Sequence, residues 1–307
     1  MRVLLVASYN KERFAPFVSE QAQALADSGC ELRFFGIQGK GPLGYLRQLP
    51  RLRREIHAFR PDVIHAHYGL SGLLANLQRR VPVVTTYHGS DINHPRVRPF
   101  SRIAMALSAW NIFVSRRTMA LVGADKHPRA SLLPCGVDLT EDQLQSRQQA
   151  RTALGWGEEE KRVLFAGAFD NAVKDPALAQ AAVAQLDGVE LCELKGYTRG
   201  QVNTLLCAAD CLLLTSHTEG SPQVIKEAMA CNCPIVSVDV GDVAERTADV
   251  EGCYVARTRS PHELAALLTR VLARSARSDG RNRLIEQGLS NAQVAQRILT
   301  LYQQIAR

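Results

Sequence analysis

The chain has 307 residues, 46% of them hydrophobic and 22% charged, which indicates a globular protein with enough apolar residues for two ordinary α/β domains. Its eight cysteines include no Cys-x-x-Cys pair, so we expect free thiols in a reducing compartment, without disulfides or a structural zinc. The net charge of +7 is unevenly placed, because residues 1–150 hold 20 Lys and Arg against 11 Asp and Glu, whereas residues 151–307 hold 17 against 19. The basic first half points to an anionic partner: a membrane surface, a phosphorylated acceptor or a nucleic acid.

The chain starts with a short apolar run at residues 2–7, which is typical of a first β-strand and too short for a secretory signal. The longest apolar stretch, residues 103–114, is interrupted by Ser108 and Asn111 and falls short of the ~20 residues of a membrane-spanning helix. We therefore expect a cytoplasmic protein without a membrane span.

Near-continuous apolar runs alternate with amphipathic segments along the whole chain. Helices are predicted between these runs, for example at residues 14–28 and 69–79. The βα repeat predicts two doubly wound α/β domains, in which ligands bind beyond the carboxyl ends of the strands. The predicted buried strands are residues 2–7, 31–37, 62–67, 82–87, 111–115 and 131–134 in the first domain and 162–167, 189–194, 211–216, 234–239 and 252–256 in the second.

The domain boundary is predicted where the chain turns polar, at residues 141–161, in a Gln-rich helix followed by a run of glutamates. The predicted organisation is a first domain over residues 1–145, a linker over 146–160, a second domain over 161–290 and a terminal helix over 291–307.

Residues 215–230 form the most informative segment, in which a strand is followed by a helix. Gly220 permits a tight turn and Pro222 suits the first helical position, so free backbone amides at the helix N-terminus would face a ligand and favour an anion. Glu219 lies before the helix and Glu227 roughly two turns along it, so two carboxylates can grip two sets of hydroxyl groups. The alternative is an ordinary capped helix with a solvated glutamate.

This segment resembles the Glu-x7-Glu signature of the family-4 retaining glycosyltransferases of the GT-B fold, with Glu219 and Glu227 at the glutamate positions. The resemblance covers nearly all of the chain. It implies two Rossmann-like domains that face a central cleft, the first for the acceptor and the second for a nucleotide sugar, and a terminal helix that crosses back towards the first domain. Its other motifs are His88-Gly89-Ser90-Asp91, Cys135-Gly136-Val137-Asp138, Pro234-Ile235-Val236 and Val240-Gly241-Asp242.

By this resemblance, Glu219 would contact the transferred sugar, Glu227 the ribose and Lys174 the diphosphate of the donor. A cation at Lys174 would stabilise the charge that develops as the nucleoside diphosphate leaves. His88 would lie near the reaction centre, so the expected catalytic residues are His88, Glu219 and Lys174. The expected donor-binding residues are Gly167, Lys174, Glu219, Gly220, Ser221, Pro222, Gln223, Val224 and Glu227. The expected acceptor-binding residues are Tyr9, Asn10, His67, Tyr68 and Asp91.

The chain departs from the family's pattern at two places. Members commonly have a Gly-Arg pair before the lysine, with the arginine also on the diphosphate, whereas this chain has Gly167 and Ala168. Members also often carry a Gly-rich turn after the first strand, whereas this chain has Ser8, Tyr9 and Asn10. An alternative function is therefore a non-catalytic GT-B scaffold that binds a nucleotide sugar or a partner protein.

Three weaker signals favour other classes of protein. Residues 39–44 match the G-x-G-x-x-G dinucleotide pattern, but they follow the second strand and contain Pro42, so we interpret them as a flexible loop near the acceptor rather than an NAD site. His65 and His67 share one face of a strand without a nearby third metal ligand. The basic first half lacks the interleaved aromatic residues of a base-stacking surface, so no nucleic acid is expected.

The expected activity is a metal-independent, retaining hexosyl or other glycosyl transfer without a cofactor, because no Asp-x-Asp pair is present to hold a metal-chelated nucleotide diphosphate. The resemblance to the family implies a front-face mechanism in which the leaving phosphate assists. The expected acceptor is a lipid-linked, saccharide or small molecule, possible products being cell-envelope or other polysaccharides.

Residues 45–60 predict a basic amphipathic helix that begins at Pro50 and could attach the first domain to anionic membranes. Its apolar face would be Leu52, Ile56 and Phe59. The alternative is a surface helix whose apolar face packs on the sheet. The flanking cations are Arg51, Arg53, Arg54 and Arg60.

Overall fold

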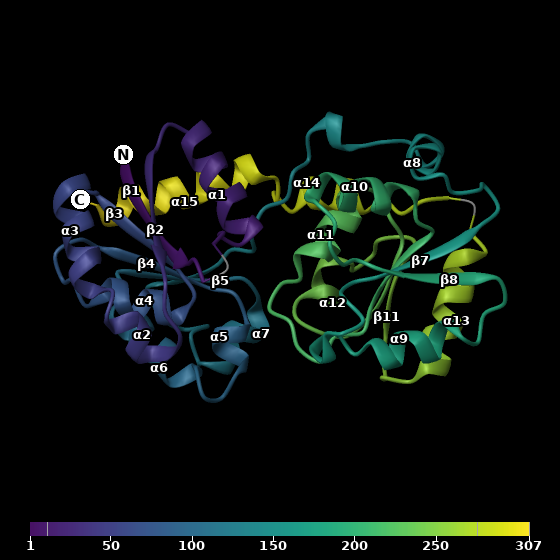
Figure 1. Ribbon diagram of the computed structural model, residues 1–307, viewed down its shortest axis with the longest axis horizontal. Coiled ribbons are helices and arrows are strands. Elements are labelled where there is room, and N and C mark those ends of the chain that lie inside the picture. The colour runs from purple at the N-terminus through teal and green to yellow at the C-terminus, as the bar shows by residue number, and fades with distance from the viewer. Residues whose placement is uncertain (11, 275, 307) are drawn as a thin grey trace. The chain divides into compact units, whose positions relative to one another are not determined.

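The computed structural model describes residues 1–10, 12–274 and 276–306, and the chain divides into two compact units (Figure 1). The first unit is Met1–Gly136 with Asn291–Arg307, and the second is Val137–Ser290. Each unit has its own parallel β-sheet with helices on both faces. The predicted α/β class with two doubly wound units is therefore confirmed. In the part of the chain that the structure describes, no helix is long and apolar enough to cross a membrane.

The sheet of the first unit has the strand order β2-β1-β3-β4-β5-β6, and every pairing is parallel. Strands β3 and β4 are buried along their whole length, including the two histidines of β3 and the two threonines of β4. All six predicted strands of this half are present. Their bounds are β1 (Arg2–Ser8), β2 (Glu31–Ile37), β3 (Val63–His67), β4 (Val83–Tyr87), β5 (Trp110–Phe113) and β6 (Ala130–Leu132).

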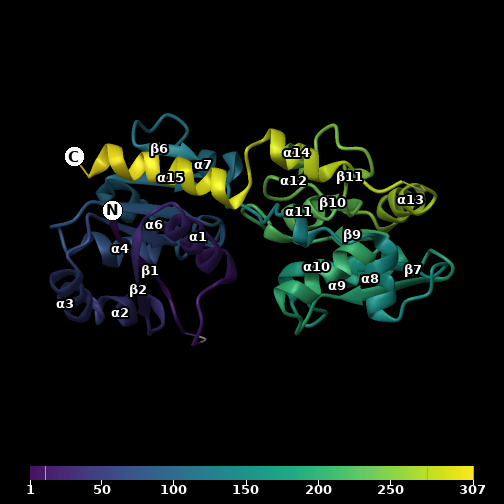
Figure 2. The same ribbon diagram turned by 90° about the horizontal axis from the view of Figure 1, so that it is seen from above.

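Two layers of helices cover this sheet. The terminal helix α15 packs against α1 on one face, as seen in Figure 2. Helices α3 and α4 cover the other face, where their apolar residues form a common core with β1, β2 and β3. The helices of this unit are α1 (Pro16–Asp27), α2 (Gly41–Leu46), α3 (Leu49–Phe59), α4 (Gly69–Asn76), α5 (Ser90–Asn93), α6 (Arg98–Leu107), α7 (Arg116–Leu121) and α15 (Asn291–Ile305).

Two sequence interpretations of this unit need correction. Residues 39–44 were expected to form a flexible loop, but Gly41–Leu46 is helix α2, because Pro42 fits the first turn, where its missing N–H costs no hydrogen bond. Helix α3 begins next to Pro50 as predicted, but its apolar residues Leu52, Ile56 and Phe59 are buried in the core. This apolar face is therefore unavailable to a membrane.

The sheet of the second unit has the order β11-β10-β9-β7-β8, again with parallel pairings throughout. The five strands predicted for this half are all present. Their bounds are β7 (Lys161–Phe165), β8 (Val189–Glu193), β9 (Cys211–Leu214), β10 (Ile235–Val238) and β11 (Cys253–Ala256).

Helices α9 and α13 lie together against one face of this sheet, while α10 packs with α8 and α11, and α11 packs with α14. The helices of this unit are η1 (Glu141–Gln143), α8 (Arg147–Leu154), η2 (Ala172–Lys174), α9 (Pro176–Val183), α10 (Arg199–Ala208), α11 (Gln223–Ala230), α12 (Val243–Arg246), α13 (Pro261–Leu272) and α14 (Gly280–Glu286).

The boundary between the units lies earlier than the sequence predicted. Residues 137–160 pack within the second unit, so the segment 146–160 is not a free linker. Arg151 explains the difference, because its fully buried guanidinium donates to the backbone carbonyls of Gly157, Glu158 and Glu160 and pairs with Asp210 at 2.8 Å. A single buried arginine thus fastens this polar segment to the body of the unit.

The strand order sets where each unit can bind a ligand. In the first sheet the order reverses between β1 and β3, and in the second between β7 and β9. Doubly wound sheets bind ligands beyond the carboxyl ends of the strands at such a switch point. The expected acceptor residues follow β1, β3 and β4, and the expected donor residues follow β7 and β9.

Candidate active site

Three expected donor residues meet at the switch point of the second unit. Gly167 follows β7, Lys174 ends the 3₁₀ turn η2, and Glu219 follows β9. Lys174 Nζ donates to Glu219 Oε1 at 2.6 Å, and both side chains are mostly buried. A Cβ on Gly167 would lie 2.7 Å from Lys174 Cγ, so only glycine leaves room for this lysine. The structure thus brings together Lys174 and Glu219, which lie 45 positions apart in the sequence.

The backbone at Lys174 and Asp175 is fixed by side chains of two other segments, Thr215 and Arg259. Thr215 Oγ1 lies 2.8 Å from the carbonyl oxygen of Lys174 and 2.9 Å from that of Asp175. Arg259 donates to the Thr215 carbonyl and to the Asp175 carboxylate, both at 2.6 Å. Sequence reasoning missed Arg259, which comes from the loop after β11 and has no motif of its own.

The segment after Glu219 presents the N-terminus of α11. The helix begins at Gln223, and Pro222 is its N-cap rather than its first helical residue. Gly241, with φ of +60°, packs against this turn, and a Cβ there would lie 2.8 Å from the Gly220 carbonyl oxygen. Ser221 Oγ donates to Asp242 Oδ2 at 2.9 Å. Gly241 and Asp242 therefore shape the turn that precedes the helix amides.

A buried charge cluster lies behind this turn. Burial raises the pKa of Asp242, while the positive charges of Lys226 and Arg246 and the Ser221 hydrogen bond oppose that rise. Lys226 lies on α11 and is completely buried, and Arg246 Nε lies 3.4 Å from Asp242 Oδ2. The sequence signal for this cluster is a lysine, Lys226, among the apolar residues of α11.

The second glutamate of the motif has a separate partner. Glu227, on α11, forms an ion pair with Arg199, the first residue of α10. Sequence reasoning did not single out Arg199. Each of the two motif glutamates thus holds a cation, Glu219 through Lys174 and Glu227 through Arg199.

In the first unit, aromatic and histidine rings gather where β3 and β4 end. His67 Nδ1 lies 3.0 Å from His88 Nε2, and the two rings are stacked. The rings of Phe17 and Tyr68 contact the His88 ring with centroids 4.6 and 4.7 Å away. Tyr68 has φ of +73°, an unusual conformation for a residue with a side chain and one that recurs at functional sites.

Two of the expected acceptor residues, Asp91 and His67, are buried. Asp91 is 3% exposed and accepts hydrogen bonds from the backbone N–H groups of Gly69, His88 and Gly89. Burial raises the pKa of Asp91 to about 6, against the lowering effect of these bonds. His67 is fully buried, so it reaches any ligand only through His88. Burial of these polar groups depends on tertiary packing, which the local motif did not reveal.

The other two expected acceptor residues lie after β1. Asn10 pairs with the backbone of Gly39, donating through Nδ2 at 2.8 Å and accepting at 2.7 Å. Tyr9 packs its ring against Phe14 with centroids 4.8 Å apart. Both contribute to the shape of the carboxyl edge of the sheet beside β2.

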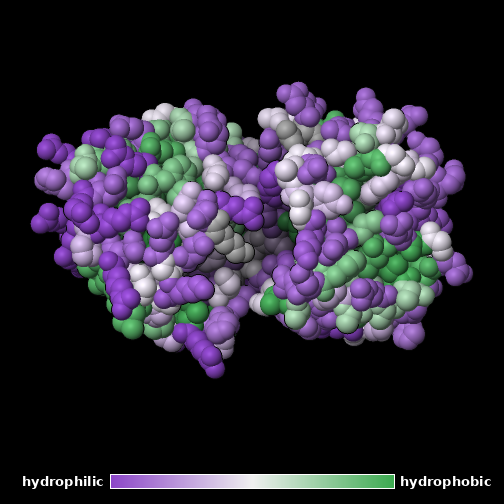
Figure 3. All heavy atoms as spheres, viewed as in Figure 1, coloured by the Kyte–Doolittle hydropathy of each residue, from purple (hydrophilic) through white to green (hydrophobic). Residues whose placement is uncertain are grey.

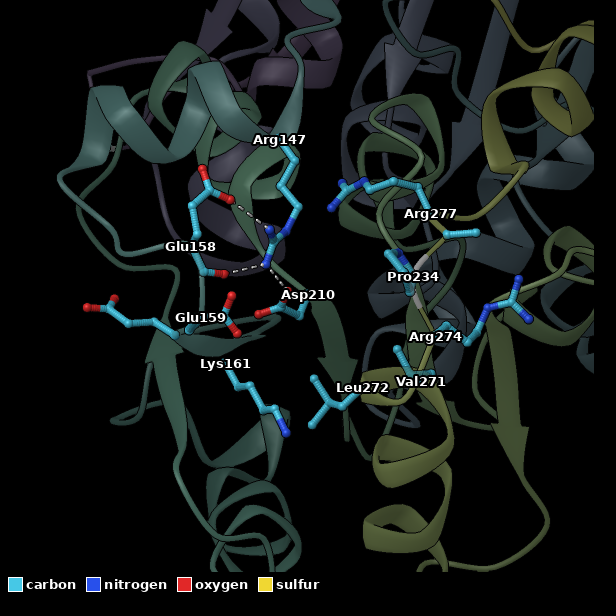
Figure 4. A pocket seen from close by; sticks show the side chains of 12 residues that line it. Arg147, Glu158, Glu159, Lys161, Asp210, Pro234, Val271, Leu272, Arg274 and Arg277 are labelled. Carbon is cyan, nitrogen blue, oxygen red and sulfur yellow. Dashed lines mark hydrogen bonds and ion pairs between the residues drawn. The ribbon is translucent and has the colours of Figure 1, made fainter.

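A separate cavity of about 430 Å³ lies at the opposite, amino edge of the second sheet (Figure 4). Lys161, Asp210 and Pro234, which line it, stand at the starts of β7, β9 and β10. Arg147, one of the three arginines that line it, forms ion pairs with Asp210 and Glu158. The cavity is therefore remote from the donor residues along the strands. Among the described residues, no group of three or more His, Cys, Asp or Glu could hold a metal ion.

Comparisons with known proteins agree with this geometry. The model of Glycosyltransferase Family 4 matches residues 18–141, and the model of Glycosyl transferases group 1 matches residues 148–274. The chain is 26% identical over 242 residues to the putative teichuronic acid biosynthesis glycosyltransferase TuaC of Bacillus subtilis, covering 68% of this chain and 61% of that protein. The chain spans only 52–61% of the length of the first curated relatives it matches.

Solved structures with the same architecture share little sequence with the chain. Sucrose-phosphate synthase from Thermosynechococcus elongatus superimposes with a TM-score of 0.84 at 19% identity, covering 99% of both chains. Anabaena HepE in complex with UDP superimposes with a TM-score of 0.76 at 15% identity, covering 99% of this chain and 100% of that one. At these identities the likeness establishes the GT-B fold alone.

Proposed function

Because the chain belongs to the family-4 glycosyltransferases of the GT-B fold, we propose that it transfers a hexosyl or other glycosyl group from a nucleotide diphosphate sugar to an acceptor. The observation that carries this proposal is the pairing of Lys174 with Glu219 beside the N-terminus of α11. A cation, a carboxylate and helix amides are thereby gathered at one switch point.

Each of these groups suits one part of such a donor. The ammonium group of Lys174 and the amides of Gly220, Ser221, Gln223 and Val224 suit the diphosphate, because charge-assisted bonds and helix N-termini both favour phosphate. Glu219 suits hydroxyl groups of the transferred sugar, and Glu227 those of the ribose. The complex of Anabaena HepE with UDP supports the choice of donor class.

The proposed reaction retains the anomeric configuration. The bond between C1 of the sugar and the β-phosphate oxygen breaks, and the acceptor oxygen bonds to C1 on the same face. The acceptor's proton passes to the departing phosphate oxygen. Lys174 would stabilise the charge on that phosphate as it leaves. We propose that this neutralisation proceeds without a metal ion, because the sequence contains no Asp-x-Asp pair to chelate one.

The first unit is proposed to bind the acceptor, which we infer to be a saccharide, a lipid-linked molecule or a small molecule. The biosynthetic role named for TuaC supports a saccharide acceptor. His88 is the residue proposed to lie nearest the reacting groups, because its ring stands at the carboxyl ends of β3 and β4 among Phe17 and Tyr68.

We also propose that the first unit attaches to the cytoplasmic face of an anionic membrane, through helix α2 and not through helix α3. Helix α2 exposes Leu43 and Leu46, which are 73% and 39% exposed. The visible face of this unit carries hydrophobic patches among many hydrophilic residues (Figure 3). Lys40, Arg47 and Arg54 lie nearby in the sequence and are exposed. Apolar residues beside cations suit weak, reversible attachment. The buried apolar face of α3 takes no part.

The non-catalytic alternative rests on Ala168, which stands where the family commonly has a second cation on the diphosphate. A binding scaffold and an enzyme would both bind the donor, but only an enzyme would break its glycosidic bond.

A thermal-shift screen against uridine, guanosine and adenosine diphosphate sugars tests the choice of donor. A ligand that binds the folded state raises the melting temperature by mass action, so the preferred donor should give the largest shift. Equal shifts for all nucleotide sugars and for inorganic pyrophosphate would contradict a site that holds ribose and sugar as well as phosphate.

A further inference from the structure

Three histidine rings form a continuous stack in the first unit. The His65 and His67 rings lie 4.6 Å apart with an interplanar angle of 20°, and the His67 and His88 rings lie 5.2 Å apart at 26°. His65 and His67 are fully buried, whereas His88 is half-buried at the end of the stack. The stack therefore connects the interior of the unit to the residue nearest the proposed chemistry.

The nitrogens of the stack differ in their partners. His65 has two, Tyr302 Oη at 2.5 Å on Nδ1 and Thr86 Oγ1 at 2.7 Å on Nε2. His67 has His88 Nε2 on its Nδ1, but its buried Nε2 has no hydrogen-bond partner among the described residues. The remaining nitrogen of His88, Nδ1, lies 3.9 Å from Cys135 Sγ.

The unpartnered Nε2 of His67 decides where the hydrogens lie. Burial lowers the pKa of His67 to about 3, so its ring is neutral near pH 7 and carries one N–H. If His88 donated from its Nε2, His67 Nδ1 would have to accept and the single hydrogen of His67 would be on the Nε2 of His67. That N–H would then be buried without a hydrogen-bond acceptor among the described residues. Orphaned buried N–H groups are rare, and an unused lone pair is better tolerated. The His67 hydrogen therefore belongs on Nδ1, donating to His88 Nε2.

We propose that His67 is a positioning residue that fixes His88 in the tautomer with its hydrogen on Nδ1. In this tautomer the Nδ1–H of His88 donates to Cys135 Sγ, a weak acceptor at 3.9 Å. An oxygen acceptor, such as a hydroxyl or carbonyl oxygen of a substrate, would take the place of this sulfur. His88 acts as a hydrogen-bond donor in this arrangement and not as a general base. The effect on transfer rests on the proposed function, whereas the tautomer does not.

Nitrogen-15 NMR of the histidine-labelled full chain near pH 7 tests the tautomer directly. In the wild type, His88 should show a protonated Nδ1 and an unprotonated Nε2, and so should His67. His88→Asn assigns the His88 signals. His67→Leu removes the donor and should shift His88 towards the Nε2–H tautomer. His65→Gln is the matched control, since His65 shares the strand and the stack but does not bond to His88, and the His88 tautomer should not change.

A protonated Nε2 on His88 in the wild type would overturn the assignment, even if a variant failed to fold. An unchanged His88 tautomer in folded His67→Leu would overturn the role of His67. With an identified donor, His67→Leu should lower kcat by at least about tenfold with KM nearly unchanged, and His67→Asn, whose amide can donate, should recover part of that loss. A rise in KM with unchanged kcat would contradict the positioning of His88. Absence of turnover in the wild type would refute the proposed function but would not affect the assigned tautomer.

Discussion

Lys174 and Glu219 are bonded to each other at 2.6 Å, although the proposed reaction assigns them to different parts of the donor. The lysine is held by a turn whose carbonyls accept from Thr215, and the glutamate by a turn packed against Gly241. Two separately supported turns thus meet at one ion pair. Changes to either side chain should therefore be separable from changes to the fold.

Lys174→Ala should be unusually damaging, because Ala168 supplies no second cation and the helix amides would be left alone on the diphosphate. We expect donor affinity or turnover to fall by well over tenfold, the equivalent of ~1.4 kcal/mol. Calorimetric titration with the donor and steady-state kinetics measure both. If affinity and turnover both stay within about threefold of the wild type, another cation must hold the diphosphate.

Glu219→Gln and Glu227→Gln should have different effects. The first should abolish transfer with the fold intact, because Glu219 is assigned to the reacting sugar. The second should mainly weaken donor binding, because Glu227 is assigned to the ribose and pairs with Arg199 on another helix. Parallel measurement of kcat and donor affinity separates the two, and an equal loss of affinity with unchanged turnover in both would contradict this division.

Gly241→Ala should weaken donor binding by displacing the turn at Gly220. The new Cβ would lie 2.8 Å from the Gly220 carbonyl oxygen, and φ of +60° disfavours a side chain as well. Gly188→Ala is the matched control, with φ of +67° and nothing within 4 Å of the new Cβ. Both should lose about 1 kcal/mol of stability from the backbone. Only Gly241→Ala should lose donor affinity, and equal affinity in the two variants would show that this contact does not shape the site.

Asp91 should make stability depend on pH. Burial raises its pKa from 3.8 to about 6, so its favourable contribution is full below pH 4 and is lost as the pH rises through 6. Between pH 4 and pH 7 the unfolding free energy of the wild type should therefore fall by roughly 2 kcal/mol relative to that of Asp91→Asn. Urea unfolding of both proteins measures this difference and cancels the opposite effect of His67, which is common to both. A difference independent of pH would show that Asp91 does not titrate in this range.

The sequence predicted the framework well because the central strands of both parallel sheets are buried and appear in the sequence as short apolar runs. The more exposed strands β2, β6 and β8 still contain enough apolar residues to be recognised, and each predicted run is a strand in the structure. Helix α2 was missed because its glycines suggested a loop, whereas Pro42 sits harmlessly in the first turn. The boundary was misplaced because the buried Arg151 makes a polar segment part of the second unit.

The site was predictable only where a local motif carries it. Glu219, Glu227 and Gly220 stand in one contiguous segment, and Lys174 was placed by the family's pattern. Burial of His67 and Asp91 depends on neighbouring strands and loops, which no local pattern encodes. The same holds for the ion pair of Arg199 with Glu227 and for the buried charges of Lys226, Asp242 and Arg246, which come from different elements of the second unit.

Binding to anionic vesicles should depend on α2 and its neighbouring cations. Each arginine near such a surface contributes ~1 kcal/mol, so Arg47→Gln with Arg54→Gln should weaken binding, as should high salt. Leu43→Ser with Leu46→Ser should weaken it without affecting the core, because both side chains are exposed. Co-sedimentation measures the bound fraction. No binding of the wild type at low salt would favour an acceptor in solution.

The most direct test of the proposed function is the release of nucleoside diphosphate from the preferred donor by purified wild-type protein and Glu219→Gln in parallel. A competent active site transfers sugar slowly to water even without its acceptor. We expect steady release by the wild type and none by Glu219→Gln, with both proteins folded and the wild type binding the donor. Donor binding by the wild type without any release, with or without added saccharide acceptors, would contradict glycosyl transfer and identify the chain as a binding scaffold.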